Sequence, residues 1–213
     1  MFAGLGLWAS IQKEDNSHLS SFDEKSLYPI KITGLNYTKC EENRLMTKIK
    51  SDELKVNPRK FFIFNIKPFN EVTLNNTTIE VYLYEDTHSD TNLFSFGGDL
   101  LSVKQGNKAS LKGMGLITRG VINDLVLKIY KASSLSILVK AKKAHIDFKK
   151  DETKLQKASI EGIFSNKIIK STLIIWNEKE KIFKIPGEYI ALSPMGWQRG
   201  KGIKVDLDFV LFE

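Results

Sequence analysis

Cysteine and histidine are scarce in this chain, and their scarcity excludes several kinds of chemistry. Cys40 is the only cysteine among 213 residues, so no intrachain disulfide, cysteine-based zinc cluster or paired redox motif can form. The three histidines, His18, His88 and His145, stand far apart in the sequence. Neither a Walker-type phosphate loop nor a dinucleotide-binding glycine fingerprint occurs. The sequence therefore predicts a protein that is not an enzyme and implies no metal and no other cofactor.

Long apolar runs are also missing. No segment approaches the ~20 apolar residues that a membrane-spanning helix needs. Residues 1–10 are apolar and contain Trp8, but they lack the leading positive charges of a full signal peptide. Two interpretations stay open, a frayed N-terminus and the outer end of a membrane anchor. We expect residues 1–26 to be a lead-in or anchor remnant and residues 27–213 to form the folded domain.

The charge of the chain is positive but dispersed. The formal net charge is +7, and most of the positive charge comes from lysines spread singly along the sequence. A nucleic-acid groove usually gathers arginines and aromatic residues on one element. We therefore expect no nucleic-acid partner, and a basic β-sheet module that binds nucleic acid or another surface remains the alternative function.

Alternation of apolar and polar residues at period two dominates the chain past residue 30, and helical spacing is nearly absent. This alternation is typical of strands with one buried and one solvated face. The clearest run extends from Ile203 to Phe212 and predicts one continuous strand. Glycines and polar residues interrupt the pattern at about 85–115, where a long loop is expected. The predicted fold is all-β, with roughly ten or more antiparallel strands and almost no helix beyond the N-terminus.

A repeat indicates the supersecondary unit. Three segments, at residues 49–66, 139–160 and 169–185, each begin with an apolar residue, a lysine and a small residue, followed by an apolar pair two positions apart. The third copy, IKSTLIIWNEKEKIFKI, matches the first, IKSDELKVNPRKFFIFNI, with one residue deleted. Each copy predicts a β-hairpin, with turns at Asn57–Pro58 and Asn177–Glu178. Repeated hairpins cannot bury their apolar faces alone, so we predict a twisted, open antiparallel β-jellyroll, or half-barrel.

Branched and aromatic side chains are abundant on the predicted inner faces. Each of them fits a closed core, but together they would also line an apolar slot if the sheets do not meet along one side. The predicted lining residues are Ile49, Val56, Phe62, Phe64, Ile66, Leu127, Ile129, Val139, Ile146, Phe148, Leu173 and Ile175. A slot of this kind predicts binding of lipid acyl chains.

The stretch from Tyr28 to Tyr84 resembles the LptC family, the periplasmic, membrane-anchored component of the lipopolysaccharide export machine, and its OstA-like relatives. The pattern consists of a first strand with Leu35 and Tyr37, a charged turn at residues 41–44, and the segments IKSDELKV and FFIFNI. The second half, from GLITRGVINDLVLKIY through IDFKK to VDLDFVLF, is similar to longer members of the family.

The resemblance implies a non-catalytic lipid carrier in the periplasm, associated with the inner membrane. Its implied partners are lipopolysaccharide, whose lipid A acyl chains would lie inside, the transmembrane subunits of an ABC transporter, and a periplasmic bridge protein of similar fold. The bridge protein would continue the sheet at an edge strand. We expect that edge in the last strand, at Ile203, Val205, Leu207, Phe209 and Leu211.

Overall fold

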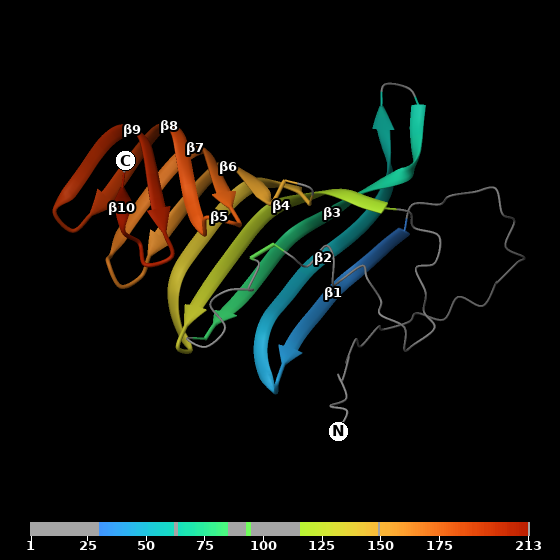
Figure 1. Cartoon of the computed structure of the whole chain (residues 1–213), viewed down its shortest axis with the longest axis horizontal. Coiled ribbons are helices and arrows are strands. Elements are labelled where there is room, and N and C mark those ends of the chain that lie inside the picture. Colours follow the sequence, from blue (N-terminus) through green and yellow to red (C-terminus); the bar gives the residue numbers. More distant parts are fainter. Residues whose placement is uncertain (1–29, 62–63, 85–92, 95–115, 149, 213) are drawn as a thin grey trace, which may run out of the picture.

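The computed structural model describes residues 30–61, 64–84, 93–94, 116–148 and 150–212, and the predicted lead-in at residues 1–26 lies outside them. The described residues form one open sheet in the order β1 to β10, without a helix (Figure 1). The strands are β1 (Ile30–Glu41), β2 (Arg44–Phe61), β3 (Phe64–Leu83), β4 (Leu116–Lys131), β5 (Ser134–Asp147), β6 (Glu152–Gly162), β7 (Lys167–Asn177), β8 (Ile182–Ser193), β9 (Gly196–Asp206) and β10 (Leu211–Phe212). The predicted all-β class and the open, mostly antiparallel sheet are confirmed.

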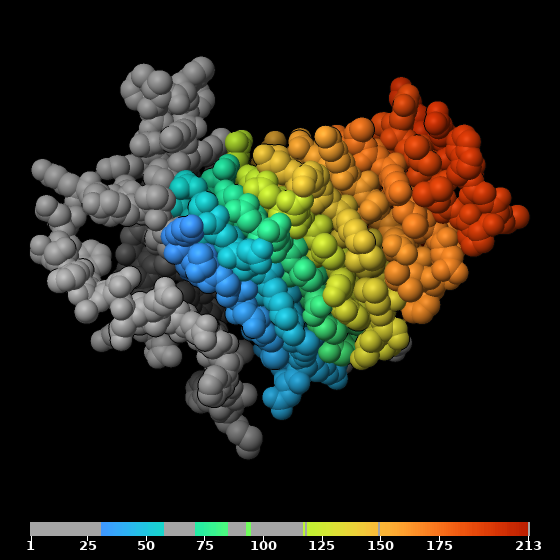
Figure 2. All heavy atoms as spheres, turned by 180° about the vertical axis from the view of Figure 1, so that it is seen from behind, coloured from blue at the N-terminus to red at the C-terminus, as the bar shows by residue number. Residues whose placement is uncertain are grey.

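Tight turns connect most neighbouring strands. The β1–β2 turn places Glu42 and Asn43 at positive φ, and the β4–β5 turn does the same with Ala132 and Ser133. Two successive residues at positive φ are typical of two-residue hairpin turns. Chain order and spatial order coincide, so the sequence colours cross the surface as successive bands (Figure 2).

The pairing of β3 with β4 is the exception, because these two strands are parallel. A parallel pair needs a connection that returns along the length of the strands. This connection contains the predicted loop at about 85–115, most of which lies outside the described residues. Leu93 and Phe94 are described, and both are buried.

The three repeat copies do become hairpins: β2 with β3, β5 with β6, and β7 with β8. Neighbouring hairpins stand side by side in one sheet. The turn expected at Asn57–Pro58 is wrong, because β2 continues to Phe61 and Pro58 pairs with Asn70. A register shift between Pro58 and Lys60 accommodates the proline within this long hairpin.

A crease crosses the sheet at one level. In β2, Ile49 and Ser51 are buried before the crease, whereas Leu54 and Val56 are buried after it, so the buried phase moves by one residue. Residues at the same level in five other strands, β1, β3, β4, β6 and β9, adopt positive φ: Gly34, Asn76, Asp124, Lys157 and Gly202. A residue in this conformation within a strand bends the strand and shifts its phase. The crease therefore keeps the apolar side chains on the inner side of a bent sheet.

The repeated sequence has a structural meaning at this crease. In each copy, the apolar residue at the first position and the small residue at the third position point inward. The next two residues lie at the crease and point outward, and the sixth residue points inward again. The inward triplets are Ile49, Ser51 and Leu54; Val139, Ala141 and Ala144; and Ile169, Ser171 and Ile174. The repeat thus encodes the bend of the strands as well as the hairpin.

The sheet curls so that its two rims, the two borders formed by the ends of the strands and their turns, come into contact. The first rim carries the β4–β5, β6–β7 and β8–β9 turns, and the second rim carries the β5–β6, β7–β8 and β9–β10 turns. Phe209 follows β9 at the second rim, yet it packs on Gly162, at the end of β6 on the first rim. Contact between opposite rims requires the sheet to close around its apolar face. The buried side chains on both sides of the crease accordingly form one hydrophobic core cluster.

The predicted continuous strand from Ile203 to Phe212 is wrong. β9 ends at Asp206, and the chain turns back so that Leu211 pairs with Val205 in β10. The Asp206 carboxylate makes this turn, because its Oδ1 atom accepts hydrogen bonds from the backbone N–H groups of Asp208 at 2.9 Å and Val210 at 2.8 Å. Period-two alternation does not reveal a side chain that bonds to its own backbone.

Candidate functional site

The apolar interior of the curled sheet is the first candidate site. Six of the predicted lining residues lie fully inside it, namely Ile49, Val56, Leu127, Ile129, Val139 and Ile146. Phe148 is half-buried and packs against the same core cluster. These residues come from β2, β4 and β5 and from the turn after β5. The structure therefore brings most of the predicted lining together on one face.

Leu173 and Ile175 do not belong to this interior. Both are half-buried on the opposite face of β7, and the fully buried residues of this strand are Ile174 and Trp176. The prediction aligned Leu173 and Ile175 with Leu54 and Val56 of the first repeat copy, which required a one-residue deletion before Leu173. This deletion made the predicted inward positions wrong by one residue. Without that deletion, Ile174 aligns with Leu54 and Trp176 aligns with Val56, as the crease requires.

Three further predicted lining residues cannot be placed. Phe62 lies outside the described residues. Phe64 and Ile66 belong to β3, but their side chains fall outside the described part of the chain.

The interior is closed near the β7–β8 turn by residues that the sequence did not single out. Trp176 and Phe183 are fully buried, with ring centroids 4.5 Å apart. The Glu178 carboxylate accepts hydrogen bonds from the Trp176 indole at 2.6 Å, the Lys181 ammonium at 2.6 Å and the backbone N–H of Leu93 at 3.2 Å. Glu178 thereby ties the β3–β4 connection to the second rim. An i,i+2 pair of Trp and Glu before a turn was the available signal, but the contact with Leu93 spans 85 positions.

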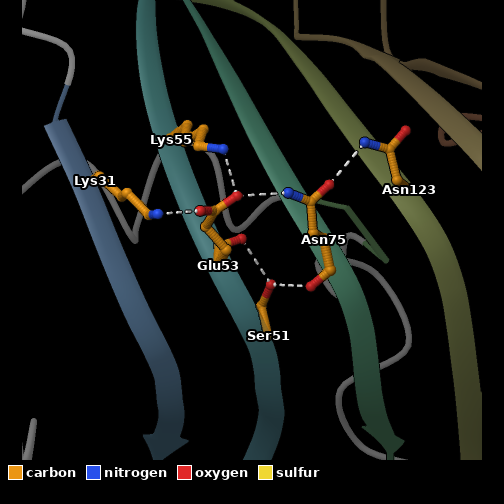
Figure 3. Close-up of polar contacts among 6 residues, drawn as sticks. All are labelled: Lys31, Ser51, Glu53, Lys55, Asn75 and Asn123. Atoms are coloured by element: carbon orange, nitrogen blue, oxygen red, sulfur yellow. Dashed lines mark hydrogen bonds and ion pairs between the residues drawn. The ribbon is translucent and has the colours of Figure 1, made fainter.

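The outer surface of the crease carries a polar network around Glu53 (Figure 3). Lys31 approaches the Glu53 carboxylate at 2.8 Å, Lys55 at 2.6 Å, and the Asn75 amide donates to it at 2.8 Å. Asn123 donates in turn to the Asn75 side chain at 2.7 Å. These residues belong to β1 to β4, so the network holds four strands together where they bend.

Hydrogen bonds from Lys31, and then from Lys55, lower the pKa of Glu53 from 4.5 to about 2. A carboxylate held ionised in the folded state stabilises the fold above its unfolded pKa. That contribution is lost as the pH falls from about 4.5 towards 2. We expect Glu53→Gln to be less stable than the wild type at pH 7 and to lose less stability on acidification through this window. Urea unfolding at a series of pH values in low salt measures both effects.

Lys31→Met provides the matched control, because it removes the largest cause of the shift and leaves the carboxylate in place. The folded-state pKa of Glu53 should then rise, which NMR titration of the side-chain carboxyl carbon measures. Equal acid sensitivity of Glu53→Gln and the wild type would show that the network does not contribute to folding.

The two ends of the sheet are the second candidate site. Among the described strands, none pairs with the outer side of β1, with residues 196–202 of β9 or with the outer side of β10. Unpaired N–H and C=O groups at such an edge can accept a strand from another chain. The unpaired part of β9 carries Arg199 and Lys201, and Trp197 is 65% exposed.

Of the five predicted partner-edge residues, Leu211 lies on the last strand of the sheet, and the other four lie in β9 or in the turn that follows it. Ile203 and Val205 are buried in β9, and Val205 already pairs with β10. Leu207 lies in the turn, Phe209 is buried, and Leu211 belongs to β10. The free edge at this end of the sheet therefore consists of the start of β9 and the outer side of the short strand β10, which contains Leu211.

Histidine and carboxylate side chains could support catalysis or bind a metal if they were grouped together. His145 lies half-buried, and burial, followed by the nearby charge of Lys143, lowers its pKa. Among the described residues, no group of three or more His, Cys, Asp or Glu side chains is placed to hold a metal ion. In the same part of the chain, no helix has the length and hydropathy to cross a membrane.

Comparison with models of protein families finds no matching family, and comparison with curated proteins finds no match.

Proposed function

We propose that this chain is a non-catalytic lipid-binding component of lipopolysaccharide export. It receives acyl chains in the interior of the curled sheet and passes them to a periplasmic bridge protein of similar fold. Its fold is then the twisted β-jellyroll half-barrel of the LptC and OstA-like proteins that the sequence resembles. The observation that supports this function best is one open sheet with an almost entirely apolar inner face that curls around its own core.

The interior suits alkyl chains chemically. Its buried residues are almost all aliphatic or aromatic, and the few buried polar ones are hydroxyl-bearing, such as Ser51 and Thr77. Burial of one CH₂ group is worth about 0.8 kcal/mol, so ten methylenes contribute roughly 8 kcal/mol before ordering costs. The core side chains on both sides of the crease are buried in one cluster, so in this proposal acyl chains enter by moving apart the parts of the sheet on either side of the crease. The crease is the natural place for that movement, because the strands already bend there.

The proposed cellular setting follows from this function. The protein works in the periplasm at the inner membrane, next to the transmembrane subunits of an ABC transporter. The free edge of β1 at one end of the sheet and that of β9 and β10 at the other are the places where neighbouring proteins of similar fold can continue the sheet. The two free edges lie at opposite ends of the sheet (Figure 1). A neighbouring protein could therefore extend the sheet, and with it the apolar interior, at either end.

Photocrosslinking tests the function directly. Tyr37 packs against the core on the inner face of β1, whereas its neighbour Thr38 is exposed. We expect p-benzoylphenylalanine in place of Tyr37 to crosslink to radiolabelled lipopolysaccharide, and the same residue in place of Thr38 not to crosslink. Adjacent positions on opposite faces give a matched control, and circular dichroism verifies the fold of both variants.

Two results would count against the proposal. Equal labelling at Tyr37 and Thr38 would indicate nonspecific adsorption to the surface. Absence of labelling at Tyr37, together with nucleic-acid binding that weakens steeply with salt, would favour the basic surface-binding function instead.

A further inference from the structure

The turn after β9 crosses from one rim of the sheet to the other. Phe209 is only 7% exposed and belongs to the core cluster. Asp208, its neighbour, forms an ion pair with Lys131 at the end of β4. Lys131 and Gly162 both lie at the first rim, whereas β9 reaches the turn from the second rim. The turn therefore fastens together the two rims that enclose the interior.

Gly162 is shaped to receive the Phe209 ring. An ideal Cβ atom at position 162 would lie 2.5 Å from Cγ and 2.7 Å from Cδ2 of Phe209, closer than real contacts allow. Gly162 has no positive φ, so close approach, not backbone conformation, requires glycine here. The Phe209 ring thus packs at a specific site on Gly162, at the first rim.

The turn is held in a conformation that is unfavourable in itself. Phe209 has a φ of 61°, a region that bulky residues rarely adopt. The Asp206 hydrogen bonds to the Asp208 and Val210 backbone impose this conformation, and β10 adds only a two-residue pairing with β9. Strained residues of this kind cluster at sites that switch between states. Only the two-residue pairing of β10 with β9 would be lost from the sheet if this segment moved away from Gly162.

We propose that the turn containing Phe209 is a built-in latch, and that the Phe209 ring occupies a site on Gly162 that an acyl chain takes when the interior opens. This inference rests on the proposed function, because it assigns the place where a ligand chain enters or leaves. In the closed state the aromatic ring fills the apolar gap between the rims, and Lys131 and Asp208 hold it there. Release of the ring exposes the core between β6 and β9.

Binding of dansylundecanoic acid, a fluorescent fatty acid, tests the latch. Phe209→Ala should raise the apparent affinity and the association rate by about tenfold, because a larger share of the protein is then open. Phe212→Ala is the matched control, since Phe212 lies in the same tail but is exposed. It should leave both values unchanged.

A second variant separates release of the ring from the cavity that its removal creates. Gly162→Ala, combined with Ser165→Ala because the Ser165 hydroxyl also lies 2.5 Å from the added Cβ, expels the ring without deleting it. This double variant should bind the probe faster than Ser165→Ala alone, and further replacement of Phe209 by Ala should add little.

The outcomes distinguish the two levels of inference. A wild type that binds the probe, with unchanged rates in the Phe209 and Gly162 variants, would overturn the latch and leave the carrier function standing. A gain confined to Phe209→Ala would mean that the probe fills an engineered cavity, and it would also overturn the latch. No binding by any folded form would overturn both.

Discussion

Ile174→Asp is expected to abolish folding or to lower the free energy of unfolding by at least about 4 kcal/mol, because it places an unpaired charge in an apolar core. Ile174 has no exposed surface and lies in the single core cluster. Its partner on β6, Leu155, is equally buried, so the charge would have an apolar neighbour on that strand. Urea unfolding followed by circular dichroism measures the loss.

Ile175→Asp is the matched control on the adjacent position. Ile175 is half-buried on the outer face and pairs with Lys154 on β6 and Lys184 on β8. An aspartate there would lie between two lysines, an arrangement that stabilises neighbouring strands. We expect its stability to stay within about 1 kcal/mol of the wild type. A larger loss at Ile175 than at Ile174 would show that the inner and outer faces of β7 are assigned the wrong way round.

This pair of residues also shows how far the sequence predicts the fold. Period-two alternation identified the strands and the all-β class, because strand pleating imposes that period on any sheet with one buried face. Alternation within each short run says nothing about where the phase changes. Five strands change phase at residues of positive φ, and only Gly34 and Gly202 among those residues carry an obvious sequence signal. Asn76 and Asp124 carry a weaker signal, because asparagine and aspartate adopt positive φ more often than most residues, and Lys157 carries none.

The site was predicted less completely than the fold, for a different physical reason. The buried residues of β2, β4 and β5 follow from local alternation, and six of them were correctly placed inside. The contacts that close the interior join segments far apart in the sequence, such as Leu93 with Glu178 and Gly162 with Phe209. Contacts of this kind arise from the curl of the whole sheet, which no local pattern encodes.

Trp176→Ala is expected to cost about 3–5 kcal/mol of unfolding free energy, the usual range for deleting a large buried aromatic side chain. The Trp176 ring has no exposed surface and packs against Phe183. Its indole N–H also donates to Glu178, which holds Leu93 at the second rim. Removal of the ring therefore leaves a cavity and deprives Glu178 of one of its hydrogen-bond donors. Thermal and urea unfolding followed by circular dichroism measure the change.

Trp197→Ala provides the comparison, because Trp197 is 65% exposed near the free edge of β9 and contacts the Arg199 guanidinium at 5.3 Å from its ring centroid. Its deletion should change stability by no more than about 0.5 kcal/mol. Trp176→Phe should fall between the two, because it retains an aromatic ring but loses the indole donor. If Trp176→Ala costs no more than Trp197→Ala, the β7–β8 end of the interior is open in solution and Glu178 does not hold it closed.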